Sequence, residues 1–267
     1  MTYFRLRVIS LGAGVQSTTM ALMAAHGELD RPDCAIFADT GWEPRAVYEH
    51  LERLERALPF PVHRVSAGNI RDHIIAKTNA TGGRFATVPW FTSNGGMGRR
   101  QCTREFKIDP LARKQRELLG YVKRQHIPVN SVEVWIGISL DEAIRMKPAR
   151  NAWQVNRWPL IERQMNRRDC VSWLSERGWT APKSACVGCP YHSDDQWRAL
   201  RDGDPEGWTD AVEVDASLRV HGLVRGKRHL DFMHRSLKPL SEVDLSVPSD
   251  WGQGDLFGNE CEGMCGV

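Results

Sequence analysis

A glycine-rich turn joins the first apolar segment of this chain to its first helical segment. Residues 4–11 (FRLRVISL) have the composition of a β-strand, Gly12 to Ser17 follow as a turn, and residues 17–25 predict a helix that ends at Gly27. A strand, a short turn and a helix in this order form the first unit of a parallel sheet covered by helices. The chain is therefore predicted to have an α/β fold.

Later segments repeat this alternation of strand and helix. Residues 34–39 (CAIFAD) form a short, largely apolar run, which is typical of a strand buried on both faces of a sheet. The residues after Pro44 predict a helix with one apolar face, and residues 62–65 and 132–138 predict two more strands. Strands and helices that alternate in this order favour a parallel sheet with crossover helices.

The remaining segments contain fewer signals for strands. Residues 80–101 are rich in glycine and predict a long loop, and residues 166–178 predict a helix capped by Asn166. Ser193 and Gln196 have the spacing of a capping box and predict the start of another helix. We expect an α/β domain, a helical region and a C-terminal tail or lid, which are residues 1–165, 166–238 and 239–267.

Composition excludes several classes of protein. With 41% hydrophobic and 26% charged residues in 267, the chain is typical of a globular protein and not of a disordered or fibrous one. No apolar stretch approaches the roughly 18 residues that span a bilayer, and the N-terminus lacks the pattern of a signal peptide. We therefore expect a cytoplasmic protein with no membrane partner.

The positive charges are unevenly distributed along the chain. The net charge of +3 is smaller than that of a dedicated nucleic-acid-binding protein. Residues 99–124 nevertheless form a basic run, with positive charges at Arg99, Arg100, Arg104, Lys107, Arg113, Lys114, Arg116, Lys123 and Arg124. Two explanations stay open, namely a solvated helix face and a surface that guides a phosphate backbone or a nucleotide phosphate toward a site.

Seven cysteines, an odd number in an expected reducing compartment, favour metal binding or redox chemistry over structural disulfides. Cys186 and Cys189 form a C-x-x-C motif, whose two thiolates can reach one ion or cluster. Cys102 lies in a loop with arginines on both sides, where positive charge favours the thiolate, so it is the expected third ligand. Cys34 and Cys170 lie on apolar faces and are expected to be core residues.

The turn after the first strand has the features of an anion site. Its backbone amides and the hydroxyls of Ser17 and Thr18 are placed to face a phosphate at the positive end of a helix. The spacing of the Walker motif and the dinucleotide motif G-x-G-x-x-G are both absent. The alternative is a tight connection between strand and helix that holds no ligand.

Taken together, the motifs of the chain follow the order found in one known family. The matching segments are Gly12–Thr18 (GAGVQST), Phe37–Trp42 (FADTGW), Cys102–Leu111 (CTREFKIDPL), Trp135–Arg145, Asn156–Leu160 (NRWPL) and Cys186–Cys189. In this order they resemble the phosphoadenosine phosphosulfate (PAPS) reductase-like family of the PP-loop superfamily. Two residues depart from the pattern, since Gln16 stands where the loop usually has aspartate and Ser139 replaces an arginine.

The resemblance implies a Rossmann-like (HUP/PP-loop) sheet with helices on both faces, and a site for ATP or another adenine nucleotide with Mg²⁺ as a further candidate. The residues it implies for nucleotide binding are Ser10, Gly12, Gly14, Ser17, Thr18, Asp39, Thr40 and Gly41. Asp39 is also a candidate catalytic residue, and the alternative is that it caps the next helix.

The cysteines resemble the [4Fe-4S] sites of PP-loop tRNA thiolation enzymes, in which three cysteines leave one iron open. By this resemblance Cys102, Cys186 and Cys189 are the metal ligands. Cys261 and Cys265, in a segment that resembles the C-terminal motif of PAPS reductases without its histidine, are candidate catalytic residues or a fourth ligand. Two alternatives stay open, which are a structural zinc on the two cysteine pairs and free thiols.

Three functions follow from these expectations. The first is sulfur transfer from a sulfur donor to an acceptor carbonyl activated by adenylation, with tRNA, DNA or a small molecule as the acceptor. The second is reduction of PAPS or adenylylsulfate with a thiol reductant, in which a tail cysteine attacks the sulfonate. The third is a non-catalytic nucleotide-binding protein with structural zinc.

The aromatic residues yield a last set of expectations. Trp42, Trp90 and Trp158 are expected in loops near the nucleotide site, where they would stack on a base. The core or helix-packing tryptophans are expected to be Trp153, Trp173, Trp179 and Trp197. No histidine has the spacing of a metal ligand, and His192 is assigned no role.

Overall fold

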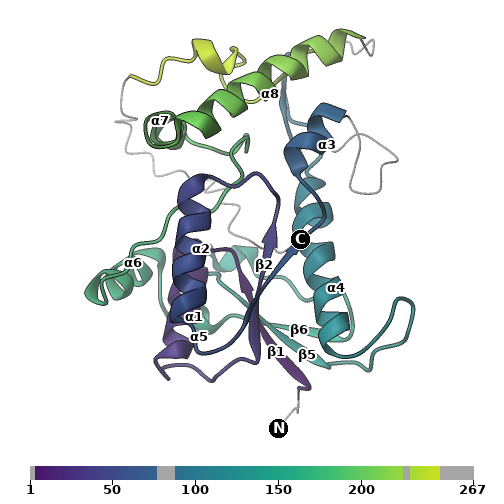
Figure 1. Cartoon of the computed structure of the whole chain (residues 1–267), viewed down its shortest axis with the longest axis vertical. Coiled ribbons are helices and arrows are strands. Elements are labelled where there is room, and N and C mark those ends of the chain that lie inside the picture. The colour runs from purple at the N-terminus through teal and green to yellow at the C-terminus, as the bar shows by residue number, and fades with distance from the viewer. Residues whose placement is uncertain (1–3, 77–87, 225–228, 247–267) are drawn as a thin grey trace.

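The computed structural model describes residues 4–76, 88–224 and 229–246 of the chain. Its main feature is a parallel sheet in the order β3-β2-β1-β5-β6 (Figure 1). The strands are β1 (Leu6–Leu11), β2 (Cys34–Asp39), β3 (Val62–Ser66), β5 (Val132–Ile136) and β6 (Gln154–Arg157). This order confirms the predicted α/β class and is that of a Rossmann-like fold.

The strand order places β1 at the centre of the sheet. From β1 the chain proceeds outward to β2 and β3, and then returns to the other side of β1 with β5 and β6. The connections therefore diverge between the carboxyl ends of β1 and β5, which is where open parallel sheets usually bind ligands. The glycine turn after β1 lies at this point.

Helices cover both faces of the sheet. On one face α1 (Val15–Ala25), α2 (Arg45–Ala57) and α6 (Arg167–Glu176) contribute to a core cluster with the strands. The opposite face is covered by α4 (Asp109–Leu118), whose Leu111 packs against β1, β2 and β5. The short helix α5 (Pro159–Glu162) follows β6.

A second core cluster lies above the carboxyl edge of the sheet, where Figure 1 shows α7 and α8. Its elements include α3 (Ile70–Ala76), α7 (Asp194–Gly203), α8 (Pro205–Val224), η3 (Leu240–Glu242) and the antiparallel pair β4 (Phe91–Thr92) and β7 (Asp231–Phe232). The buried carboxylate of Asp215 in α8 accepts hydrogen bonds from the amides of Met233 and Leu240, both at 2.9 Å. It thereby fastens the segment after β7 to this cluster.

Local sequence signals identified the boundaries of some elements, whereas α3, α4, α5 and α8 were not predicted. Both capping boxes are present, because the side chains of Asn166 and Ser193 accept from the backbone three residues later. The first helix begins at Val15, two residues earlier than expected, and β5 ends two residues earlier. The edge strand β6 was missed because its sequence, QVNR, has little apolar character and every residue is half-buried.

The two cysteines expected in the core are buried. Cys34 and Cys170 are both buried, and burial raises the pKa of Cys34 to about 12, so its thiol stays protonated. Within the described ranges, no helix is long and apolar enough to cross a membrane.

Gly137, directly after β5, permits a close approach between this strand and α1. A Cβ atom at this position would lie 2.9 Å from the amide nitrogen and 3.1 Å from the Cα of Ser17. Both neighbours are backbone atoms in the first turn of a packed helix, so they have little freedom to move.

We predict that Gly137→Ala lowers the free energy of unfolding by about 1–3 kcal/mol, because the methyl group forces α1 away from β5. Urea denaturation followed by circular dichroism measures the change. Gly203→Ala is the matched control, since a Cβ atom at that position meets no atom within 4 Å. Equal stability of the two variants would contradict the close approach.

A buried histidine couples α1 to α2. The side chains of Thr18 and His50 are hydrogen-bonded at 2.9 Å, and the His50 ring packs edge-on against Trp179 at 6.0 Å. Burial, followed by the charge of Arg53, lowers the pKa of His50 from 6.5 to about 4. The imidazole is therefore neutral in the folded protein at neutral pH.

The unfolded chain binds a proton at His50 between pH 6.5 and about 4, whereas the folded chain does not. The stability that His50 contributes is therefore present above pH 6.5 and is lost as the pH falls, by up to about 1.4 kcal/mol per pH unit. Urea denaturation at pH 7, 6 and 5 checks this, with His50→Gln as the comparison. The prediction is wrong if the two proteins lose stability in parallel.

Candidate functional site

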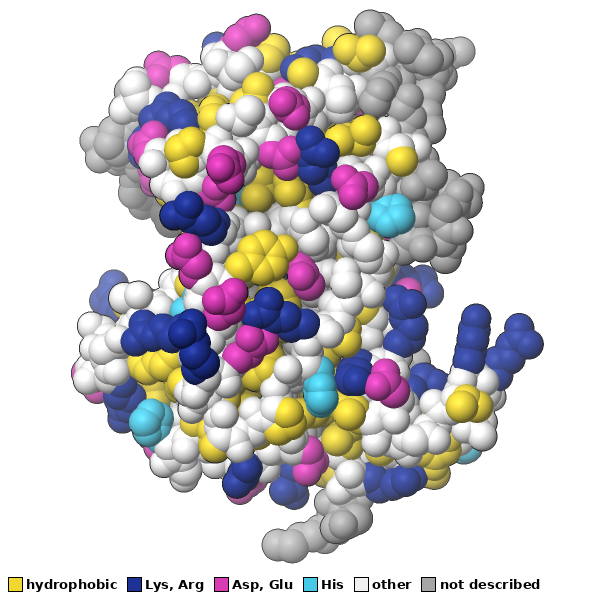
Figure 2. Space-filling view, viewed as in Figure 1, with side chains coloured by type: hydrophobic (Ala, Val, Ile, Leu, Met, Phe, Trp, Pro, Cys, Tyr) yellow, Lys and Arg dark blue, Asp and Glu magenta, His cyan; other side chains and the backbone are white. Residues whose placement is uncertain are grey.

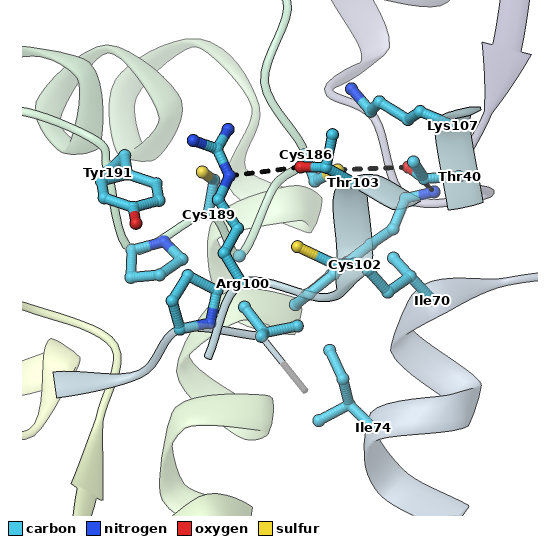
Figure 3. Close-up of a pocket in the computed structure, with 15 residues that line it drawn as sticks. Thr40, Ile70, Ile74, Arg100, Cys102, Thr103, Lys107, Cys186, Cys189 and Tyr191 are labelled. Atoms are coloured by element: carbon cyan, nitrogen blue, oxygen red, sulfur yellow. Dashed lines mark hydrogen bonds between the residues drawn. The ribbon is translucent and has the colours of Figure 1, made fainter. Parts of the chain in front are cut away.

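Three segments that are distant in the sequence meet above the carboxyl end of β2. They are the turn after β2, the start of a π-helical segment, η1 (Thr103–Ile108), and the C-x-x-C loop. Cys102, Cys186 and Cys189 all line one pocket between these segments, together with Thr40 (Figure 3). We call this the thiol pocket.

The C-x-x-C loop is docked on the turn after β2. The Val187 amide donates to the Trp42 carbonyl at 2.8 Å. Gly188 lies flat beneath the Trp42 ring, where a Cβ atom would come within 2.1 Å of the ring. Any larger residue at position 188 would displace either the loop or the indole, so the placement of both cysteines depends on this glycine.

His192 holds the loop from its other side. Its Nε2 lies 3.0 Å from the Cys186 carbonyl oxygen, and its ring packs edge-on against Trp197 at 4.6 Å. Burial lowers the pKa of His192 to about 4, so the neutral ring donates through Nε2. The sequence assigned no role to this residue, because metal-ligand spacing was the criterion and His192 instead bonds the backbone.

The geometry of η1 brings Cys102 and Lys107 to the same pocket. Hydrogen bonds in a π-helix join residues five apart, so the five-residue spacing of Cys102 and Lys107 places them near the same side. At the pocket rim, Arg100 donates to the Thr103 hydroxyl at 3.2 Å, and its guanidinium lies 4.9 Å from the centre of the Tyr191 ring. One side of the rim is therefore cationic and aromatic.

A buried polar cluster lies next to Cys186. Glu43 Oε1 accepts from the Thr40 hydroxyl at 2.9 Å and lies 3.6 Å from both Lys107 Nζ and Cys186 Sγ. The Thr40 hydroxyl also lies 3.3 Å from Cys186 Sγ. The side chains of Glu43 and Lys107 are only 2% and 7% exposed, so each neutralises a charge that would be costly to bury alone.

Glu43 and Lys107 were not among the predicted site residues. Lys107 belongs to the C-T-R-E-F-K motif, and this motif is the sequence signal by which it could have been found. Glu43 directly follows the T-G-W segment, but its contact with Lys107 joins residues 64 apart and has no local signature.

Asp39 shapes the turn that carries Thr40. Its carboxylate accepts from the Gly41 amide at 2.7 Å and from the Tyr48 hydroxyl at 2.9 Å. Gly41 has a φ of +69°, and a Cβ atom there would lie 2.9 Å from the Asn69 Cα. Asp39 and Gly41 thus position Thr40 at the thiol pocket, while Asp39 in catalysis stays a prediction.

The glycine turn after β1 is closed by its own residues. The Ser17 hydroxyl lies 3.2 Å from the Gly12 amide and 3.3 Å from the Gly14 carbonyl, and Ala13 adopts a left-handed φ of 58°. Gly14 caps α1 without any side-chain hydrogen bond to the first-turn amides. Those amides and the helix dipole are the groups to which the expected phosphate would bind, so the anion site stays a prediction.

The turn residues do not line the thiol pocket, but they lie beside it on the same edge of the sheet. The pairing of Ser10 with Ile36 and of Leu11 with Phe37 brings Gly12 next to the end of β2. Thr18 faces away, because it is fully buried against His50. We therefore leave Thr18 out of any phosphate site.

Gln16, the residue that departs from the motif of the resembled family, bridges three segments. Its amide nitrogen lies 3.4 Å from Ser139 Oγ and 3.3 Å from Glu142 Oε2, and its oxygen accepts from Arg167 at 3.0 Å. It thus links α1 to the turn after β5 and to the start of α6.

The expectation that Trp42 and Trp90 stack on a base is wrong. They are only 6% and 3% exposed and belong to the second core cluster. The Trp42 indole nitrogen also donates to Asp210 at 2.5 Å, which ties the turn after β2 to α8. Their sequence positions in loops were correct, but these loops are covered by α7 and α8. Trp158 is half-buried, so stacking by this residue stays a prediction.

The identity of the metal at these cysteines stays a prediction. Among the described residues, no group of three or more His, Cys, Asp and Glu side chains is arranged to hold one metal ion. A single zinc requires all its thiolates within about 2.3 Å of one point, whereas the thiolates of an iron–sulfur cluster bind separate irons. The tail candidates Cys261 and Cys265 lie outside the described residues.

We predict that Lys107→Met lowers the free energy of unfolding by about 3–5 kcal/mol, because it leaves the Glu43 carboxylate buried without a counter-charge. The double variant Glu43→Gln, Lys107→Met should lose less stability than Lys107→Met, because it leaves no buried charge without a partner. Urea denaturation measures both. Arg45→Met is the control, since the Arg45–Glu49 pair is exposed and is worth less than about 1 kcal/mol. A loss for Lys107→Met no larger than for Arg45→Met contradicts a buried pair.

A scan against models of protein families finds no match. A search of curated proteins likewise finds no match. The resemblance to the PAPS reductase-like family therefore stays a prediction, and the geometry of the thiol pocket is the basis for a function.

Proposed function

We propose that the protein is a sulfur-transfer enzyme that activates an acceptor with an adenine nucleotide and replaces an acceptor oxygen with sulfur. One observation carries this proposal, which is the position of three thiols around a single pocket beside the turn after β1. The sequence spacing between Cys102 and Cys186 is 84 residues, so only the tertiary fold brings them together.

The thiol pocket supports binding of a [4Fe-4S] cluster. Cys102, Cys186 and Cys189 would hold it, leaving one iron without a cysteine from the described residues. Such a cluster, when bound, supplies an iron at which sulfide can be held. The side chains of Arg100 and Lys107 line the same pocket.

The turn after β1 supports binding of the nucleotide phosphates. The uncapped amides at the start of α1 would donate to phosphate oxygens, and the two glycines allow close approach to the backbone. In the proposed reaction the acceptor oxygen attacks the α-phosphorus and pyrophosphate leaves. Hydrosulfide then adds to the acceptor carbon, and AMP departs with the oxygen. Amide donors fixed by the fold would stabilise the charge that develops on phosphorus.

The alternative reductase reaction requires a nucleophilic cysteine that is separate from the three pocket thiols. Cys261 and Cys265 are the candidates, and both lie outside the described residues. Because the described thiols share one pocket, we favour the transfer reaction over sulfite release.

We expect protein reconstituted anaerobically with iron and sulfide to contain about four irons per chain and to absorb in the visible range. Cys102→Ser, Cys186→Ser and Cys189→Ser should each lose most of the iron, because each removes one of three ligands. Cys34→Ala and Cys170→Ala should keep it, since these thiols lie in the core. Iron and zinc are measured by plasma emission spectroscopy.

Zinc without iron in the anaerobic protein would instead support the structural zinc site. For the reaction itself, pyrophosphate release from ATP should require the acceptor and should survive in Cys34→Ala. A protein that binds its cluster but releases sulfite from PAPS, with no pyrophosphate from ATP, would contradict sulfur transfer and favour the reductase.

A further inference from the structure

A strongly positive surface runs from the thiol pocket along α4. Residues 99–124 contain nine Lys and Arg residues but only three Asp and Glu residues, a balance of +6 in a chain whose net charge is +3. Five of these cations are exposed, and we call them the basic strip: Arg99, Arg104, Arg113, Lys123 and Arg124. Figure 2 shows Lys and Arg side chains gathered on this side of the molecule.

The strip is continuous with the rim of the pocket. Arg99 directly precedes Arg100, which lines the thiol pocket. Arg104 and Arg113 both contact Asp109 on the exposed side of α4, with Arg104 at 3.7 Å from its carboxylate and Arg113 at 3.4 Å from its carbonyl. The apolar side of the same helix faces the sheet through Leu111.

The far end of the strip is a preformed loop. The Arg116 guanidinium donates to the carbonyls of Val122 and Gln125 at 2.7 and 2.8 Å, and the Gln125 side chain accepts from the Val122 amide at 2.8 Å. Arg124 is held in the left-handed region, with a φ of 72°. Because these contacts already fix the loop, binding a partner would cost little ordering entropy.

The cations of this loop have no acidic partner in the described structure. Neither Lys123 nor Arg124 forms an ion pair or side-chain hydrogen bond with a described residue, and both are exposed. By contrast, the exposed cations Arg45 and Arg56 on α2 are paired with Glu49 and Glu52. The loop thus presents two unneutralised charges to solvent.

The spacing of the strip fits a linear polyanion. The helical stretch from Thr103 to Leu118 has 16 residues and is about 20 Å long, which corresponds to roughly six phosphates of one nucleic-acid strand. A membrane surface would instead require a continuous apolar face beside the cations. The large apolar side chains exposed in this loop are Val122 and Val129, at 66% and 65%.

We propose that the basic strip binds the phosphate backbone of a nucleic acid. The proposal rests on the charge and exposure of these residues and not on the pocket chemistry, so it can fail while the sulfur-transfer proposal holds. Backbone contacts of this kind are independent of sequence and weaken steeply with salt.

The test is fluorescence anisotropy with a labelled 20-base-pair DNA duplex and with an RNA duplex of the same sequence, titrated at several salt concentrations. The variant Lys123→Ala, Arg124→Ala should bind at least about tenfold more weakly at low salt, and its slope of log affinity against log salt should be shallower by about 2. The control is Arg45→Ala, Arg56→Ala, which removes two exposed cations from α2 on the opposite face of the sheet and should bind like the parent protein.

The RNA arm decides which nucleic acid is preferred. The proposal would be overturned if the two double variants lost affinity for the duplexes equally, or if the parent protein bound neither duplex measurably. Binding of the parent protein to phosphatidylserine vesicles without binding to either duplex would also overturn it, in favour of a membrane surface. An unchanged circular dichroism spectrum of the Lys123→Ala, Arg124→Ala variant would show that it is folded, so that its weaker binding results from the lost charges.

Discussion

The docking of the C-x-x-C loop on the turn after β2 is the contact on which the candidate site depends. A hydrogen bond from Val187 to Trp42 and the close packing of Gly188 under the indole fix the loop against the sheet edge. The Trp42 indole also donates a hydrogen bond to Asp210, so this one side chain connects the turn after β2, the cysteine loop and α8. Without this contact the thiols at 186 and 189 would have no fixed relation to Cys102.

The buried pair of Glu43 and Lys107 gives this arrangement a polar core. Buried ion pairs contribute little net stability, but removing one partner is costly, so the pair favours one arrangement of the surrounding segments over others. Here it joins the turn after β2 to η1, and the shared contacts with Thr40 and Cys186 extend it to the cysteine loop. The placement of the thiols is thus coupled to the Glu43–Lys107 ion pair, which tolerates little rearrangement. A pre-organised set of ligands requires such a fixed support.

Sequence patterns predicted β1, β2, β3 and β5 of the sheet and the helices α1, α2 and α6, because strand burial and helix caps are local properties. The capping boxes at Asn166 and Ser193 are examples. The link between Cys102 and the C-x-x-C motif was expected from the arginines around Cys102 and from the resemblance. The roles of Glu43 and His192 were missed, since each acts through a partner that no spacing rule connects to it. The loop tryptophans were misassigned because sequence cannot show that α7 and α8 cover those loops.

The central claim is that three thiols from two distant segments share one pocket. Short bifunctional thiol reagents test it most directly, because they link only cysteines whose side chains approach closely in the folded protein. Treatment of the native reduced chain with dibromobimane, followed by peptide mass spectrometry, should yield links from Cys102 to Cys186 or Cys189. Links confined to Cys186 and Cys189, with Cys102 modified only singly, would contradict a shared pocket and with it the proposed sulfur chemistry.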